Sequence, residues 1–240
     1  MRAIRYSMKI LAVGDVHTKS WMIEKVEKIV EDYDAVVFCG DYADNRNTTP
    51  GESLATWRLL KMLMDSNPKK VFAVIGNHDY AYIHPEIAGR SSGWNGVTYQ
   101  LVNAPENKKI KQWLLSLPPI LELDGVTFSH AGVTEEWDGD ESVAGLWNDT
   151  SPIWARPREY GGYVTYKSGP QVIGHNPSET IWNPQENVWC IDTFSEHQDN
   201  TPIGDQTVLE IIDGKEFNKI ELNKNDDNNN TASVEDEVPR

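Results

Sequence analysis

Five short apolar segments of this chain end in the same way, with a polar side chain of a metal-binding type just past the apolar residues. The segments read LAVGDVH, VFCGDYAD, AVIGNHD, FSHAG and VIGHNP. Each apolar part is short, rich in β-branched residues and bounded by Gly, Asp or Asn, which is typical of a buried strand. Because functional sites of open α/β sheets collect at the carboxyl ends of strands, we expect these polar residues to meet at one edge.

The order of strands and helices along the chain predicts an α/β fold. Strands are expected at KILAV from Lys9, AVVFC from Ala35, VFAVI from Val71, VTFS from Val126, QVI from Gln171, VWCI from Val188 and TVLEII from Thr207. Apolar residues at helical spacing predict helices around 23–30 and 54–60, and 112–117 is typical of the end of a third helix before two prolines. The early half is therefore β-α-β-α-β, which predicts parallel strands. The later half is richer in strands, which predicts a second, more antiparallel sheet.

Composition and charge limit the partners of this chain. Of its 240 residues, 39% are hydrophobic and 25% charged, which is ordinary for a soluble globular protein. No apolar run approaches the roughly 18–20 residues that a membrane helix needs, so no membrane partner is expected. The formal net charge of −15 is unfavourable for binding nucleic acid, whose affinity depends largely on Lys and Arg at phosphates.

The length and the C-terminal composition predict the domain organisation. Residues 1–223 are expected to form a single domain, because one α/β core of this size is common. Residues 224–240 are polar, Asn-rich and acidic, and we expect a disordered tail there. The two cysteines, Cys39 and Cys190, lie in apolar runs and are too few for a disulfide framework. They are expected to be buried, reduced thiols of a cytoplasmic protein.

Residues of the five segments are candidate metal ligands, and they are Asp15, His17, Asp41, Asn77, His130 and His175. In an extended chain, residues i and i+2 point the same way, so Asp15 and His17 can bind one ion together. Asp41 has two carboxylate oxygens and can bridge two ions. This mixed oxygen and nitrogen set suits Mn, Fe or Zn, and it lacks the thiolates of a structural zinc site. Each motif alone is commonly a turn or a surface pair, so the argument depends on their conjunction.

The series GDVH, GDYAD, GNHD, SHAG and GHNP resembles the motifs of the calcineurin-like metallophosphoesterase superfamily, over roughly Lys9 to Ile212. Nucleases and many phosphodiesterases of the superfamily have GHTH where this chain has Pro177 in place of the second His. GHNP, followed by IDT at 191–193, is similar to the branch of Ser/Thr protein phosphatases and diadenosine tetraphosphate hydrolases, including bacterial and phage members. The resemblance implies a β-sandwich flanked by helices, in α/β/β/α layers, and two divalent ions, with manganese expected first.

The resemblance also implies a role for each residue of the motifs. One ion would be held by Asp15, His17 and Asp41, and the other by Asp41, Asn77, His130 and His175. His78 matches the histidine that protonates the leaving group, and Asp44 matches the acid that orients it. The family has an Arg directly after that acid, where this chain has Asn45 and then Arg46. Arg46 and Arg156, which follows a Trp-Ala pair, are the candidate phosphate-binding arginines.

The implied activity is hydrolysis of phosphate esters by in-line attack of a metal-bridging hydroxide. The leading hypothesis is a phosphomonoesterase, similar to the protein phosphatases, that acts on a small molecule or a phosphoprotein. The alternative is a hydrolase of dinucleoside polyphosphates or nucleotides, or a phosphodiesterase. A second alternative is a non-catalytic metal-binding module for interaction. This last hypothesis is disfavoured because His78 and Asp44, which are not metal ligands, are both present. The sequence does not indicate an oligomeric state.

Overall fold

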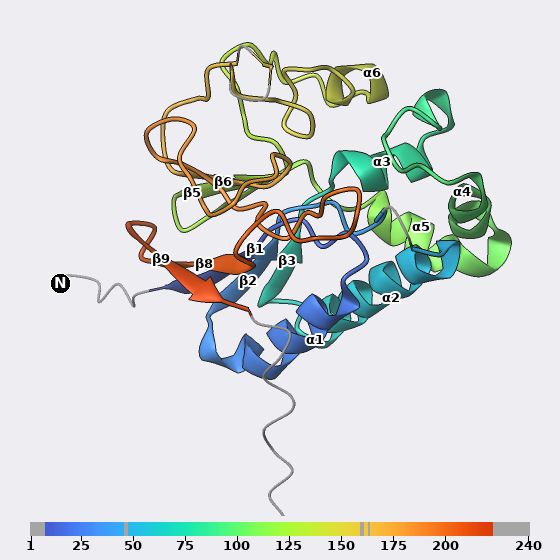
Figure 1. Cartoon of the computed structure of the whole chain (residues 1–240), viewed down its shortest axis with the longest axis horizontal. Coiled ribbons are helices and arrows are strands. Elements are labelled where there is room, and N and C mark those ends of the chain that lie inside the picture. Colours follow the sequence, from blue (N-terminus) through green and yellow to red (C-terminus); the bar gives the residue numbers. More distant parts are fainter. Residues whose placement is uncertain (1–7, 46–47, 159–160, 163, 223–240) are drawn as a thin grey trace, which may run out of the picture.

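The structure is a computed structural model that describes residues 8–45, 48–158, 161–162 and 164–222. Two β-sheets pack face to face, and helices cover the outer face of the first sheet (Figure 1). This arrangement of two sheets flanked by helices confirms the expected sandwich. Two earlier expectations, a disordered tail over 224–240 and a phosphate-binding role for Arg46, lie outside the described residues. Within the described ranges, no helix is both long and apolar enough to cross a membrane.

The first sheet has the strand order β3-β2-β1-β8-β9. Its strands are β1 (Lys9–Val13), β2 (Ala35–Phe38), β3 (Val71–Ala73), β8 (Thr207–Ile212) and β9 (Glu216–Glu221). β1, β2 and β3 are parallel, and β8 and β9 extend the sheet antiparallel beside β1. β1 is buried on both faces, because Leu11 packs toward the helices and Ile10 toward the second sheet. Burial on both faces explains why the strand is apolar from Ile10 to Val13.

The second sheet has the strand order β4-β5-β6-β7. Its strands are β4 (Ile120–Leu123), β5 (Val126–Ser129), β6 (Gln171–Ile173) and β7 (Val188–Cys190). β5, β6 and β7 are parallel, so the expectation of a more antiparallel second sheet is wrong. The long connections 130–170 and 174–187 permit parallel crossovers, whereas the short turns before β5 and β9 force antiparallel pairs.

The helices follow the strands that they connect. They are α1 (Ser20–Ile29), α2 (Pro50–Ser66), α3 (Asn77–Ile83), α4 (Gly96–Asn103), α5 (Lys108–Leu114) and α6 (Val143–Leu146), with 3₁₀ turns at Val30–Asp32, Pro85–Ile87 and Pro105–Asn107. α1 and α2 connect the first three strands, as the sequence predicts, and α2 begins with a capping box between Thr49 and Glu52. The short helix α6 lies on the side of the second sheet in Figure 1. α3 begins four residues after the last residue of β3 and carries part of the GNHD motif.

Candidate metal centre and active site

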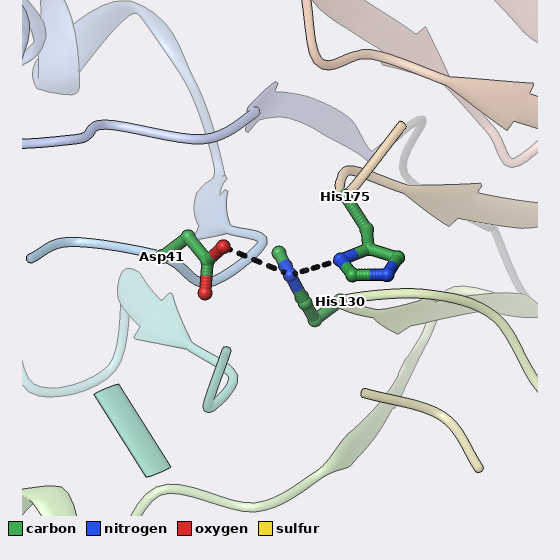
Figure 2. Close-up of side chains that lie close together, drawn as sticks. All are labelled: Asp41, His130 and His175. Carbon is green, nitrogen blue, oxygen red and sulfur yellow. Dashed lines mark hydrogen bonds and ion pairs between the residues drawn. The ribbon is translucent and has the colours of Figure 1, made fainter. Parts of the chain in front are cut away.

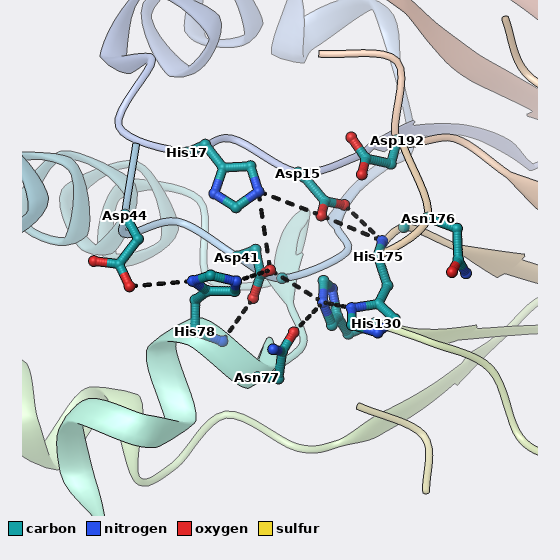
Figure 3. A network of polar contacts seen from close by, with 12 residues as sticks. Asp15, His17, Asp41, Asp44, Asn77, His78, His130, His175, Asn176 and Asp192 are labelled. Atoms are coloured by element: carbon teal, nitrogen blue, oxygen red, sulfur yellow. Dashed lines mark hydrogen bonds and ion pairs between the residues drawn. The ribbon is translucent and has the colours of Figure 1, made fainter. Parts of the chain in front are cut away.

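The structure brings the six predicted ligands together where strands of both sheets end (Figure 3). Asp41, His130 and His175 form one group of possible ligands, and Asp15, His17 and Asp41 form a second group. Within each group, the possible ligand atoms lie within 4.8 Å of one another. Asp41 therefore belongs to both groups, as the sequence predicts for a bridging carboxylate.

Several residues of the ligand segments have left-handed backbone conformations, which direct the ligands back toward this site. The residues with positive φ include His17 (42°), Thr18 (61°), Asp41 (52°), Asp44 (61°) and His175 (67°). Such conformations cost about 1–2 kcal/mol per residue for side chains other than glycine, so packing must offset them. Much of the turning after the strands therefore occurs at the ligand residues themselves.

One glycine is required for a different reason, the close approach of two segments. A Cβ atom on Gly76 would lie 2.2 Å from the backbone nitrogen and Oδ1 of Asp41. Only glycine allows the segment after β3 to pass so near the candidate bridging carboxylate. This contact places Asn77, the next residue, beside Asp41.

The first ligand group places His17 between two carboxylates. The Nδ1 atom of His17 is 3.1 Å from the carbonyl oxygen of Ala43, which can only accept, so Nδ1 carries the proton. Nε2 then presents its lone pair 3.7 Å from Oδ2 of Asp15 and 4.0 Å from Oδ2 of Asp41. These separations are too long for hydrogen bonds, so the three groups surround a space suited to a cation. Burial, followed by the nearby carboxylates of Asp192 and Asp41, raises the pKa of Asp15.

The second ligand group is centred on His130 (Figure 2). Its Nδ1 atom donates to the carbonyl oxygen of Cys39 at 2.9 Å, which leaves Nε2 unprotonated. Nε2 lies 2.9 Å from Oδ1 of Asn77, 3.2 Å from Oδ2 of Asp41 and 3.1 Å from Nδ1 of His175. Two acceptor oxygens therefore face the same nitrogen lone pair. A divalent ion would satisfy all of these groups together, so the donor set fits a metal.

His78 lies beside the two ligand groups without belonging to either. Its backbone nitrogen donates to Oδ1 of Asp41 at 3.0 Å, and its Nδ1 atom donates to Oδ2 of Asp44 at 3.1 Å. Burial lowers the pKa of His78, but the carboxylates of Asp41 and Asp44 outweigh it and raise the pKa to about 9. The imidazole can therefore hold a proton on Nε2, which faces the site 3.8 Å from Oδ2 of Asp41. The Tyr82 hydroxyl donates to the other oxygen of Asp44, which fixes this carboxylate from both sides.

Asp79, the last residue of GNHD, supports the site, a role that was not among the predictions from the sequence. The backbone nitrogens of Tyr42 and Ala43 donate to its carboxylate at 3.0 and 3.1 Å, and Trp57 Nε1 donates at 2.7 Å. Asp79 thus holds the segment that carries both Asp41 and Asp44. Its place next to Asn77 and His78 in the motif was a signal for this role.

A pocket of about 490 Å³ lies over the ligand groups and His78. Arg156 lines the pocket, and its guanidinium donates to Oδ1 of Asn176 at 3.3 Å. Asp44 and His78 line it too, so the candidate acid and the candidate arginine both reach the same space. Asp192 of the IDT segment is also at the pocket, and burial raises its pKa to about 6. The sequence predicted no role for Asp192 beyond its place in the IDT segment that marks the branch.

A comparison with curated proteins gives a partial match. Over 89 residues the chain is 34% identical to a symmetrical bis(5′-nucleosyl)-tetraphosphatase of Vibrio campbellii, which covers 37% of this chain and 32% of that protein. The chain therefore aligns with about a third of the length of this curated relative.

Solved structures share the fold at low sequence identity. A cold-active protein-tyrosine phosphatase of a psychrophilic Shewanella species gives a TM-score of 0.57 at 19% identity, covering 89% of this chain and 80% of that one. A protein serine/threonine phosphatase of Saccharomyces cerevisiae gives 0.57 at 13% identity, with 85% and 72% covered. Residues 8–199 match the model of the family described as calcineurin-like phosphoesterase. This match covers most of the chain and confirms the resemblance of the motifs, so the chain belongs to the calcineurin-like phosphoesterase family.

Proposed function

We propose that this protein is a metal-dependent phosphomonoesterase that works with two divalent ions. The observation that carries the proposal is the position of Asp41, which is shared by two groups of ligand side chains and lies beside His78. A shared carboxylate between two metal positions is the arrangement of two-metal phosphoryl-transfer sites.

The contacts in the site support the proposed role of each residue. Asp15, His17 and Asp41 would hold one ion, and Asp41, Asn77, His130 and His175 would hold the other. Manganese is the first expectation, and iron or zinc suits the same donors. When bound, such ions polarise phosphate oxygens and lower the pKa of a coordinated water. The cytoplasmic location stays a prediction, for which the two free, buried cysteines are the support.

The remaining catalytic tasks belong to side chains of the pocket. His78 donates its Nε2 proton to the departing oxygen, which is general-acid catalysis. Asp44 accepts from Nδ1 of His78 and keeps the ring turned toward the site. Arg156 binds the anionic oxygens of the phosphoryl group from the pocket wall, where its charge stabilises the transition state.

The preference for monoesters is based on Pro177 and on charge. Pro177 lines the pocket at the place where diesterases of the superfamily have a second His. Proline cannot bind a metal ion, so a phosphate oxygen could take the place of that His ligand. A monoester dianion has three non-bridging oxygens to use there, and a diester has fewer. The net charge of −15 also repels long nucleic acids. The partial identity to the Vibrio enzyme favours a second candidate, hydrolysis of dinucleoside polyphosphates.

We expect p-nitrophenyl phosphate to be hydrolysed with a kcat/KM about tenfold higher than that of bis(p-nitrophenyl) phosphate, a difference of about 1.4 kcal/mol in transition-state stabilisation. Steady-state kinetics of both esters in one Mn²⁺ buffer measures this ratio. Diadenosine tetraphosphate in the same buffer tests the second candidate. A clear preference for the diester would move the assignment to a phosphodiesterase, and loss of all turnover would favour a non-catalytic module.

A further inference from the structure

Lys19 is a buried lysine at the wall of the pocket, and the proposed mechanism does not use it. It is the N-cap residue of α1, two positions after His17, and its side chain is only 8% exposed. Lysine is almost never buried unless it has a partner or a function. Among the described residues that line the pocket, Lys19 and Arg156 are the ones with long cationic side chains.

The partner of Lys19 holds it loosely. Its Nζ atom lies 3.6 Å from Oε1 of Glu196, which is longer than a hydrogen bond. An ammonium has three donors, so this ion pair leaves donors for another ligand. Burial lowers the pKa of Lys19, and the carboxylates of Glu196, Asp192 and Asp15 oppose that shift. The ammonium group of Lys19 therefore lies at the pocket wall with donors left for an anion.

Glu196 also connects Lys19 to Asn45. The Nδ2 atom of Asn45 donates to Oε2 of Glu196 at 2.8 Å, while Oε1 faces Lys19. Position 45 is where the superfamily has an arginine next to the orienting acid, and here it carries an uncharged amide. Lys19 and Asn45 thus contact the same carboxylate, that of Glu196. Lys19 therefore brings a positive charge to the side of the pocket where the uncharged Asn45 lies.

Arg156 enters the pocket from a different part of the fold. It follows the second sheet's β5 in the chain and contacts Asn176, whereas Lys19 follows β1 of the first sheet. The two cations therefore approach the ligand groups from different sheets. A phosphoryl group held between them would be contacted on both sides.

We propose that Lys19 binds an anionic oxygen of the substrate phosphate, and of the phosphate released after hydrolysis, in place of the arginine that position 45 lacks. Glu196 holds Lys19 in position in the absence of phosphate and competes with phosphate for its ammonium group. This inference rests on the proposed phosphatase function, because it assigns the ligand of the same pocket.

Binding of inorganic phosphate to the Mn²⁺-loaded protein tests the proposal without requiring turnover. Isothermal titration calorimetry should show a Kd about tenfold or more higher for Lys19→Gln than for the native chain, because a charge-assisted contact is lost. Lys19→Arg should restore much of the affinity. Lys61→Gln is the matched control, because Lys61 pairs with Asp65 on α2 and is not among the pocket residues. Metal content should be the same in all variants.

Glu196→Gln separates binding from a merely structural role. An amide can still pair with Asn45 but carries no charge, so Lys19 should bind phosphate more tightly and the Kd should fall. If the ion pair only stabilised the fold, Lys19→Gln and Glu196→Gln would change the Kd in the same direction. That outcome, or an unchanged Kd in Lys19→Gln, would overturn the proposal.

Failure of this inference and failure of the proposed function give different results. Native turnover of phosphate esters with an unchanged Kd in Lys19→Gln rejects only the role of Lys19. Absence of native turnover, with a Kd that rises in Lys19→Gln and falls in Glu196→Gln, rejects the phosphatase function and supports the phosphate site. A native Mn²⁺-loaded chain that does not bind phosphate overturns the role of Lys19.

Discussion

Replacement of His78 by Ala is expected to lower kcat about 10²–10⁴-fold, the usual contribution of a general acid, and to leave the metal content unchanged. The ring of His78 contacts Asp44 through Nδ1 and faces the site through Nε2, but it belongs to neither ligand group. Alanine keeps the backbone nitrogen that donates to Asp41, so the carboxylate should stay in place.

The leaving group makes this prediction specific. An acidic phenol departs without a proton, so the loss should be smaller for p-nitrophenyl phosphate than for an alkyl phosphate. Kinetics on both esters measures the loss of kcat for each leaving group, and metal analysis of the same samples measures the metal content. His84→Ala is the control, because His84 lies at the other end of α3 and its ring contacts the ring of Tyr80. If His78→Ala lost its metal, the role of His78 as an acid would be wrong.

Asp41→Asn is expected to have the larger effect, a loss of both ions and a fall in kcat/KM on the order of 10³-fold or more. Asp41 belongs to both ligand groups, and an amide has one acceptor oxygen where the carboxylate has two. The substitution is isosteric and the site is buried, so the change acts through charge and not through packing.

Asp15→Asn is the matched comparison for this prediction. Asp15 belongs to the group with His17 and not to the group with His130, so this variant should lose one ion and keep the other. Metal analysis of both variants at equal free Mn²⁺ measures how many ions each variant keeps. Equal metal loss in the two variants would contradict the bridging role of Asp41.

The sequence predicted the strands and the meeting of the candidate ligands because both depend on local patterns. Seven apolar runs correspond to β1, β2, β3, β5, β6, β7 and β8. The ligands lie within four residues past the carboxyl ends of strands, so placing the strands was enough to bring Asp15, Asp41 and His175 near one another. The metal-binding and acid roles of these residues stay predictions.

Features that depend on tertiary contacts were not predicted. The strand β4 has partly exposed residues, and β9 has mostly exposed ones, so neither gives a buried apolar run. Asp79 acts through backbone nitrogens of a segment 36 residues away, and Glu196 joins Lys19 to Asn45 only after three loops meet. No spacing along the chain indicates such contacts.

The count of bound ions is the most direct test of the claim that the protein binds two metal ions that share Asp41. The native chain, equilibrated with saturating Mn²⁺ and freed of loosely held metal, is expected to contain two ions per chain by elemental analysis. An ion held by Asp15, His17 and Asp41 would have fewer protein ligands and should be lost first during dialysis, together with turnover. Two ions per chain is the result that the shared position of Asp41 predicts, and one ion or none at saturating Mn²⁺ would contradict it.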